Sequence, residues 1–354
     1  MHQPQADAPT PFPFQFKGQT GEYFKIWIVN ILLTILTLGI YSAWAKVRRK
    51  RYFYGNTLLQ DSTFEYLAQP IQILKGRLIA FVLFAIYALA NNLFPPAALV
   101  FVPAFIVVFP WLLIKTLAFN ARYSAYRNIR FDFNAGYGKA MAIYIGWPIL
   151  SLLTFGIAYP AYKYHRSKFV VAHSGYGTAP FSFGATAGEF YVTYLMAILI
   201  TLGGVLILGV VGAVLSVLPR MANAVAANGN AGLVVLSGVM TFVVMLLLLL
   251  TVRAYIETTI GNLVWNNVVS GEHRFVSTLQ TKRMLWLYIS NVLGIVFSLG
   301  LLIPWAEIRM TRYRMNNLKL LAVGELGGVV AREQQAVAAT GAEISDFFDF
   351  DVGL

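Results

Sequence analysis

Clusters of basic and aromatic residues are the part of this sequence best suited to bind a ligand. The densest covers residues 44–54, where five cations lie among four aromatic side chains, and residues 159–169 and 305–313 have a similar character. A cation at an anionic membrane surface contributes about 1 kcal/mol to binding. We therefore predict that membrane phospholipids are partners. The predicted headgroup contacts are Lys46, Arg48, Arg49, Arg51, Lys163, Arg166, Lys168, Arg309 and Arg312.

The same cations have a second interpretation. Basic residues beside apolar segments set the orientation of a membrane protein, and belts of aromatic residues accompany them at the interface. Orientation and headgroup binding would use the same side chains. The sequence alone therefore leaves open whether these cations are topology anchors only.

Other kinds of site have little support. The chain has no Cys and four scattered His, so thiol catalysis and metal sites are not expected. Neither a phosphate-binding loop nor a nucleophile elbow occurs, and no Asp or Glu lies near the middle of an apolar segment. We predict a non-enzymatic protein without a cofactor. Nucleic acid is not an expected partner, because no soluble basic domain is present.

The composition shows which elements must position the cations. Of the 354 residues, 58% are hydrophobic and only 12% are charged, about half the charged share of a soluble domain. The predicted fold class is therefore an all-α polytopic membrane protein. Its seven apolar segments have lengths suited to a bilayer. They cover residues 26–45, 78–94, 97–119, 140–159, 191–218, 233–252 and 285–305.

Parts of the sequence recur. Stretches 37–52, 154–169 and 298–313 align without gaps, and the alignment superimposes Gly39, Gly156 and Gly300. We interpret this as an internal repeat with a shared turn at the glycine. Phe-x-Phe patterns outside the apolar segments predict short β-strands or hairpins at the cytoplasmic surface.

Polar residues recur with the glycines. Asn30 and Asn291 lie inside apolar segments, nine residues before Gly39 and Gly300. Such amides either bond to another helix or line a polar cavity. Asn56, His173 and Asn317 stand four residues after the last aromatic residue of each repeat. For these three we favour helix or turn caps over a threefold polar cluster.

The distribution of charge predicts the topology. Residues 1–324 hold 26 bases and nine acids, a net charge of +17, whereas residues 325–354 hold six acids and one base. Segments 26–45, 140–159 and 285–305 have basic residues at both ends, so a single crossing would place one basic end outside. We predict three re-entrant or interfacial helical hairpins, four transmembrane helices and cytoplasmic termini. The alternative is seven ordinary spans with one violation of the charge rule.

These features suggest a division of the chain. We expect a Pro-rich arm with a short strand over 1–21, repeat units over 22–138 and 139–267, a partial repeat over 268–324, and an acidic aromatic tail over 325–354. Small residues at Gly209 and Ala213, four positions apart, suit close helix packing within the chain or in a homo-oligomer.

Several motifs together resemble a known family. They are the start Phe14-x-Phe-x-Gly followed by Gly21-Glu-Tyr-Phe-Lys-Ile-Trp27, the element over 37–52, and Tyr54-Gly-Asn-Thr57. The chain resembles the YjgN-like family of bacterial inner-membrane proteins over about residues 12–320. The second repeat departs from the pattern, with Ala161 in place of Trp44. The family is defined by a domain of unknown function, so the resemblance implies an inner-membrane location and no particular activity.

Two functional hypotheses follow. The first is a channel-like or lipid-handling protein whose basic aromatic helices contact anionic phospholipid. The second is a membrane-surface scaffold that recruits partners through its cytoplasmic β-segments and acidic tail. A polar or lipid-filled cavity at Asn30, Asn291 and Arg48 would favour the first hypothesis.

Overall fold

The computed structural model describes residues 9–225 and 231–323. The predicted acidic tail lies outside these residues. The chain divides into two compact units. The sheet unit consists of Met1–Ala187, Val264–Ser277 and Pro304–Leu354, and the span unit of Gly188–Leu263 and Thr278–Ile303. The predicted division into repeat units is not tested by these boundaries and stays a prediction.

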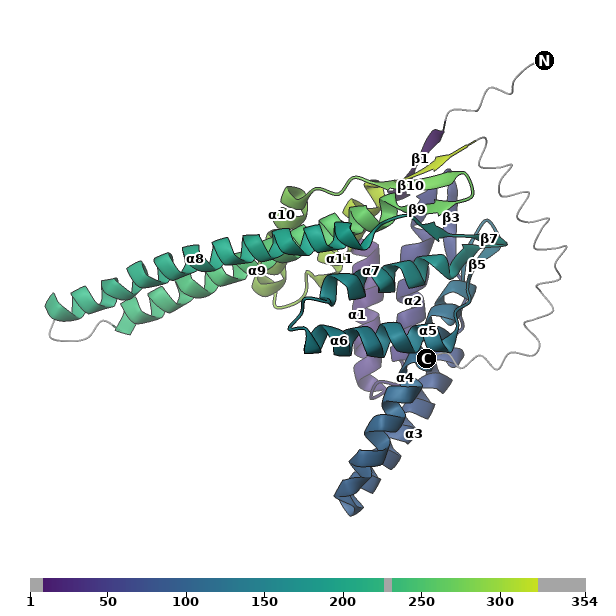
Figure 1. Ribbon diagram of the computed structural model, residues 1–354, viewed down its shortest axis with the longest axis horizontal. Coiled ribbons are helices and arrows are strands. Elements are labelled where there is room, and N and C mark those ends of the chain that lie inside the picture. The colour runs from purple at the N-terminus through teal and green to yellow at the C-terminus, as the bar shows by residue number, and fades with distance from the viewer. Residues whose placement is uncertain (1–8, 226–230, 324–354) are drawn as a thin grey trace. The chain divides into compact units, whose positions relative to one another are not determined.

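Helices make up most of the described chain, as the apolar composition predicts. Helices α3 and α4 run side by side as a pair, as do α8 and α9 (Figure 1). The first helices are α1 (Thr20–Leu36), α2 (Ser42–Gly55), α3 (Pro70–Leu93), η1 (Pro95–Ala97) and α4 (Ala98–Arg122). Next come α5 (Tyr137–Met141), the π-helical turn η2 (Ala142–Gly146), α6 (Trp147–Leu153) and α7 (Tyr159–Ala172). The last are α8 (Ala187–Val225), α9 (Ala231–Asn266), α10 (Thr281–Phe297) and α11 (Ile303–Asn316).

Short strands connect the helices, as the Phe-x-Phe patterns predict. They are β1 (Thr10–Phe16), β2 (Thr57–Leu59), β3 (Ser62–Tyr66), β4 (Ser124–Tyr126), β5 (Ile129–Phe133), β6 (Ser174–Tyr176), β7 (Ala179–Pro180), β8 (Ser182–Phe183), β9 (Val268–Ser270), β10 (His273–Ser277) and β11 (Leu318–Ala322). Within the described residues these strands form one antiparallel sheet, in the order β7-β6-β5-β4-β3-β2-β1-β11-β10-β9-β8. The predicted class "all-α" is therefore too narrow, because the short strands pair with one another into one large sheet.

The sheet is nearly closed on itself. Its two end strands, β7 and β8, are separated by Phe181 alone, and the Phe181 N–H donates to the carbonyl of Ser174 at 3.0 Å. Strand β1 is shared in a similar way, since its first half pairs with β11 and its second half with β2. A closed sheet leaves few unpaired backbone groups at its edges.

Phenylalanines from alternate strands line the concave side of the sheet. The ring centroids of Phe14 and Phe64 are 5.9 Å apart, and those of Phe64 and Phe131, Phe14 and Phe275, and Phe181 and Phe275 are each 6.4 Å apart. Strands separated by one other strand lie about 9.5 Å apart, so these rings converge inside the curve. Together with Leu59, Tyr126 and Leu320 they fill the interior with apolar side chains.

Four helices are long and apolar enough to cross a membrane: Pro70–Leu93, Ala98–Arg122, Ala187–Val214 and Val234–Asn266. This confirms the four predicted spans by length and composition. Helix α3 begins with Pro70 at its first position and has a capping box between Gln69 and Gln72, a pattern that satisfies free N–H groups at a helix start.

The three remaining apolar segments are each broken by the same turn. Gly39, Gly156 and Gly300 have φ of +92°, +89° and +92°, and each glycine N–H bonds to the carbonyl five residues earlier. Glycine alone adopts this backbone without strain. A hydroxyl then starts the second helix, because the Oγ1 of Thr37 accepts from Tyr41 N–H, and Thr154 and Ser298 accept in the same way.

Polar residues end the second helix of each of these segments. The Asn56 and Asn317 amides donate to the carbonyls four residues earlier at 2.8 and 2.7 Å, and His173 Nδ1 lies 2.8 Å from the carbonyl of Phe169. These contacts agree with the predicted caps.

Candidate functional site

The predicted cations lie mainly on α2, α7 and α11, where helix geometry spaces them along each surface. Some of them are held by the fold itself. Arg51 donates from Nε to the carbonyl of Tyr66 at 3.3 Å and from Nη2 to that of Ala68 at 3.0 Å. Arg312 donates to the carbonyl of Gly18 at 2.7 Å. Both side chains therefore stabilise the ends of neighbouring elements.

Arg49 belongs to a network that joins α2, α1 and α11. Its guanidinium lies 3.2 Å from the carboxylate of Glu307, which also accepts a 2.6 Å hydrogen bond from the buried Tyr23 hydroxyl. Burial, reinforced by the Glu307 carboxylate, raises the pKa of Tyr23. The charge of Arg49 is thus partly balanced within the protein.

Asn30 and Arg48 lie together between α1 and α2. The Asn30 side chain is 8% exposed, its Nδ2 donates to the carbonyl of Ala45, and Arg48 Nη1 donates to its Oδ1, both at 3.5 Å. Arg48 also donates to the Tyr41 hydroxyl at 3.0 Å. These contacts tie the two helices of the hairpin together. Asn291, in the span unit, is 7% exposed.

Cations of α7 and α11 rest on aromatic rings. Lys163 lies 5.4 Å from the ring centre of Tyr159, Arg166 6.0 Å from Tyr144, and Arg309 4.2 Å from Trp305. Lys168 donates to the Tyr164 hydroxyl at 3.3 Å. Rings hold such cations at a membrane interface while leaving the charge available to anions.

In the second repeated segment, Trp147 and His165 occupy the positions that correspond to Asn30 and Arg48. There His165 stacks on Trp147 at 4.4 Å between ring centres. Burial, together with the nearby Lys168, lowers the pKa of His165. The same two aligned positions thus join α1 to α2 through the Asn30 amide and α6 to α7 through stacked rings.

The same three turns carry exposed apolar side chains. Leu38, Phe155 and Leu299 are 95%, 98% and 95% exposed. Large apolar groups this exposed mark a membrane or protein contact. Along the chain, each of these residues comes before the helix that carries the cations.

Lys50 belongs to the predicted basic run 44–54, whereas Arg77 was not predicted as a headgroup residue. Arg77, near the start of α3, donates to the hydroxyl of Ser42 on α2. Lys50 donates to Asn120 Oδ1 on α4, and its ammonium lies 4.5 Å from the ring centre of Tyr66. The spacing of Lys46 and Lys50, one helical turn apart, was the available sequence signal.

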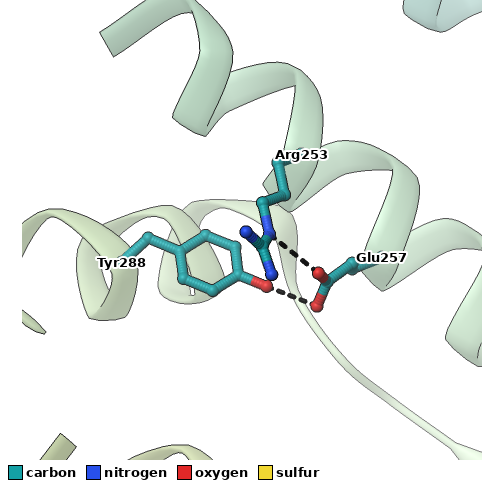
Figure 2. A network of polar contacts seen from close by, with 3 residues as sticks. All are labelled: Arg253, Glu257 and Tyr288. Atoms are coloured by element: carbon teal, nitrogen blue, oxygen red, sulfur yellow. Dashed lines mark hydrogen bonds and ion pairs between the residues drawn. The ribbon is translucent and has the colours of Figure 1, made fainter. Parts of the chain in front are cut away.

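The span unit has its own polar cluster. Arg253 and Glu257 of α9 form an ion pair of 2.9 Å, and the Tyr288 hydroxyl of α10 donates to the same carboxylate (Figure 2). Arg253 and Glu257 border a groove of about 530 Å³ between α8 and α9, whose other lining residues, apart from Thr201, are apolar, such as Val205 and Leu249. The predicted apolar segment ends at residue 252, one residue before Arg253, so the cluster was not among the predicted site residues.

Comparisons with known proteins agree with this picture. A model of bacterial proteins of unknown function (DUF898) matches residues 11–347. The chain is 30% identical over 155 residues to inner membrane protein YjgN of Salmonella typhimurium and 31% identical over 147 residues to that of Escherichia coli K12. These matches cover 40% and 41% of this chain, and only 39% and 37% of the relatives. No solved structure matches. Since the family model covers most of the sequence, the chain belongs to the DUF898 family of YjgN-like bacterial proteins.

Proposed function

We propose that this protein is a non-enzymatic, lipid-handling protein of the bacterial inner membrane. Two helical pairs, α3–α4 and α8–α9, cross the bilayer. Hairpins α1–α2, α5–α7 and α10–α11 dip into the cytoplasmic leaflet, and their cations contact anionic phospholipid headgroups. The sheet and both termini lie on the cytoplasmic side.

The contact between Arg77 and Ser42 is the main support for this proposal, because it ties the start of α2 to a fixed point along α3. Beyond Arg77, α3 continues over residues 78–93, which is about 24 Å of helix. A hydrocarbon core is about 30 Å thick. If α3 ends at the far edge of the core, Arg77 lies about 6 Å inside its cytoplasmic edge. The tip at Leu38 lies just past Ser42, at the 5–10 Å depth typical of interfacial helices.

The other roles have less support. Apolar side chains fill the concave side of the sheet, which gives no polar route for a channel through it. Most strands have hydrogen-bonded neighbours on both edges. Little free strand edge is therefore left for a scaffold to bind partners. A lipid-handling role accounts for both the exposed apolar side chains at the three turns and the cations on the helices that follow them.

Depth-dependent quenching tests the hairpins, and the lack of native Cys makes single labels specific. We expect a fluorophore on Leu38→Cys or Phe155→Cys, in liposomes, to be quenched most by lipids with a shallow acyl quencher. Val107→Cys, in the spanning helix α4, is the matched control and should be quenched most by a deep one. Labelling of the Leu38→Cys variant by an impermeant reagent from the periplasmic side would instead demonstrate a full span.

Native mass spectrometry tests lipid binding independently. The purified protein should retain phospholipid and bind added anionic lipid in preference to phosphatidylcholine. Equal retention of both lipids would refute the headgroup role while leaving the depth measurement intact.

A further inference from the structure

Three cations follow one another along the side of α2 that faces α3 and α4. Lys46 and Lys50 follow one another on the same face of α2, and Arg77 of α3 is fixed beside them by its bond to Ser42. Lys50 is fixed by Asn120 of α4 and by the ring of Tyr66. The three cations thus follow one another along about two turns of α2, with contacts from α3, α4 and β3.

Within the described residues, no carboxylate forms an ion pair with Lys46, Lys50 or Arg77. Arg49, on the same helix, pairs with Glu307. The charged groups that act on Lys46 and Lys50 are instead cations: Arg77 lowers the pKa of Lys46, and Lys46 that of Lys50, in each case after the larger effect of burial. Half-buried cations that repel one another are costly unless an anion joins them.

The position of the cluster indicates which anion. Arg77 directly precedes the apolar residues of α3 that begin at Leu78, and Lys46 and Lys50 lie one and two turns farther from the tip than Ser42. Long basic side chains at this depth extend toward the lipid headgroups. Ammonium and guanidinium groups bind phosphate oxygens through charge-assisted hydrogen bonds. Three cations suit a headgroup with more than one negative charge better than a singly charged one.

We propose that Lys46, Lys50 and Arg77 form a binding site for the phosphate of an anionic phospholipid, with a preference for a phosphate monoester headgroup. The Asn120 amide and the Tyr66 ring position the Lys50 ammonium. The inference rests on the proposed function in one respect, that hairpin α1–α2 lies at headgroup level.

Native mass spectrometry of the full chain, titrated with phosphatidic acid, phosphatidylglycerol or phosphatidylcholine, tests the site. We expect tightest binding of phosphatidic acid. Lys50→Gln and Arg77→Gln should each weaken it about tenfold, while Lys75→Gln should change it less than twofold. Lys75 is exposed and lies two residues from Arg77 on α3, so it controls for general surface charge.

The outcomes are distinct. Equal losses in all three variants, or no loss in any, would overturn the site. Competition by millimolar inorganic phosphate would show that the site takes free phosphate as its ligand and would overturn the lipid assignment. If Leu38 fails the depth test but the variants weaken lipid binding selectively, the proposed topology is wrong and the phosphate site stands.

Discussion

Replacing Lys50 with Met should make the lipid-free protein more stable while weakening its binding of phosphatidic acid. Met keeps the length and apolar stem of the side chain but removes the charge. In the folded protein, burial and the neighbouring Lys46 lower the pKa of Lys50 to about 8, from an ordinary 10.5. At pH 7 the folded state therefore holds this proton against an unfavourable environment.

The size of the effect follows from the pKa. A difference of about 2.5 pH units corresponds to roughly 3.4 kcal/mol at most, and solvent screening of a half-exposed ammonium reduces this to about 2 kcal/mol. The variant also loses the cation–π contact with Tyr66, worth about 0.5–1 kcal/mol. We expect a net gain of about 1 kcal/mol, seen as a rise of a few degrees in the melting temperature.

The pH dependence gives the sign independently. Between pH 8 and 10.5 the unfolded chain binds more protons at Lys50 than the folded one, so stability should rise with pH in this window. Lys46, whose pKa is also lowered, adds to the rise. Within the described residues, the charged or titratable groups that face Lys50 are Lys46 and Tyr66. Burial raises the pKa of Tyr66 to about 12. Measurements below pH 9.5 therefore keep the folded Tyr66 hydroxyl protonated.

Melting temperatures of wild type and Lys50→Met between pH 7 and 9.5, with and without phosphatidic acid, form the assay. Without lipid, the wild type should gain stability with pH and the variant should gain less. Lipid should flatten the wild-type dependence, because a bound phosphate favours the charged lysine. A variant that is less stable at pH 7, with an unchanged pH slope, would refute the reasoning.

Three further changes probe the framework around the site. Thermal melts should show a loss of about 1–2 kcal/mol for each of the variants Gly39→Ala, Gly156→Ala and Gly300→Ala, because φ values near +90° strain any residue with a Cβ. The control Gly21→Ala should be close to neutral, because no atom lies within contact distance of the added methyl group. Phe14→Ala should cost about 3 kcal/mol by emptying the interior of the sheet, measured as a lower melting temperature; an unchanged value would mean that the rings are not packed as described. Glu307→Gln should cost about 1 kcal/mol or less, since the Arg49 side chain is 57% exposed, and a loss well above that would show a larger role for the bond from Tyr23.

Local features of the chain were predictable and long-range ones were not. The turn glycines, the helix-ending Asn56 and Asn317, and the four long helices follow from short-range rules of backbone conformation and apolar length. The nearly closed sheet does not, because alternation identifies a strand without identifying its partner. Lys50 belongs to the basic run that the sequence singles out, but its contact with Asn120, 70 residues later, could not be predicted for the same reason.

The order of the strands constrains how the chain assembles. Helical hairpins alternate with pairs of strands, and the ring of pairing is completed only when β1, at the start, joins β11, about 300 residues later. Such a distant contact forms late, because the entropy of closing the intervening chain must be overcome first. The apolar spans α3–α4 and α8–α9 lie inside that closed loop of sequence. Membrane insertion of the spans should therefore precede closure of the sheet, and the apolar rings of Phe14 and Phe275 reach their common interior only when β11 is in place between their strands.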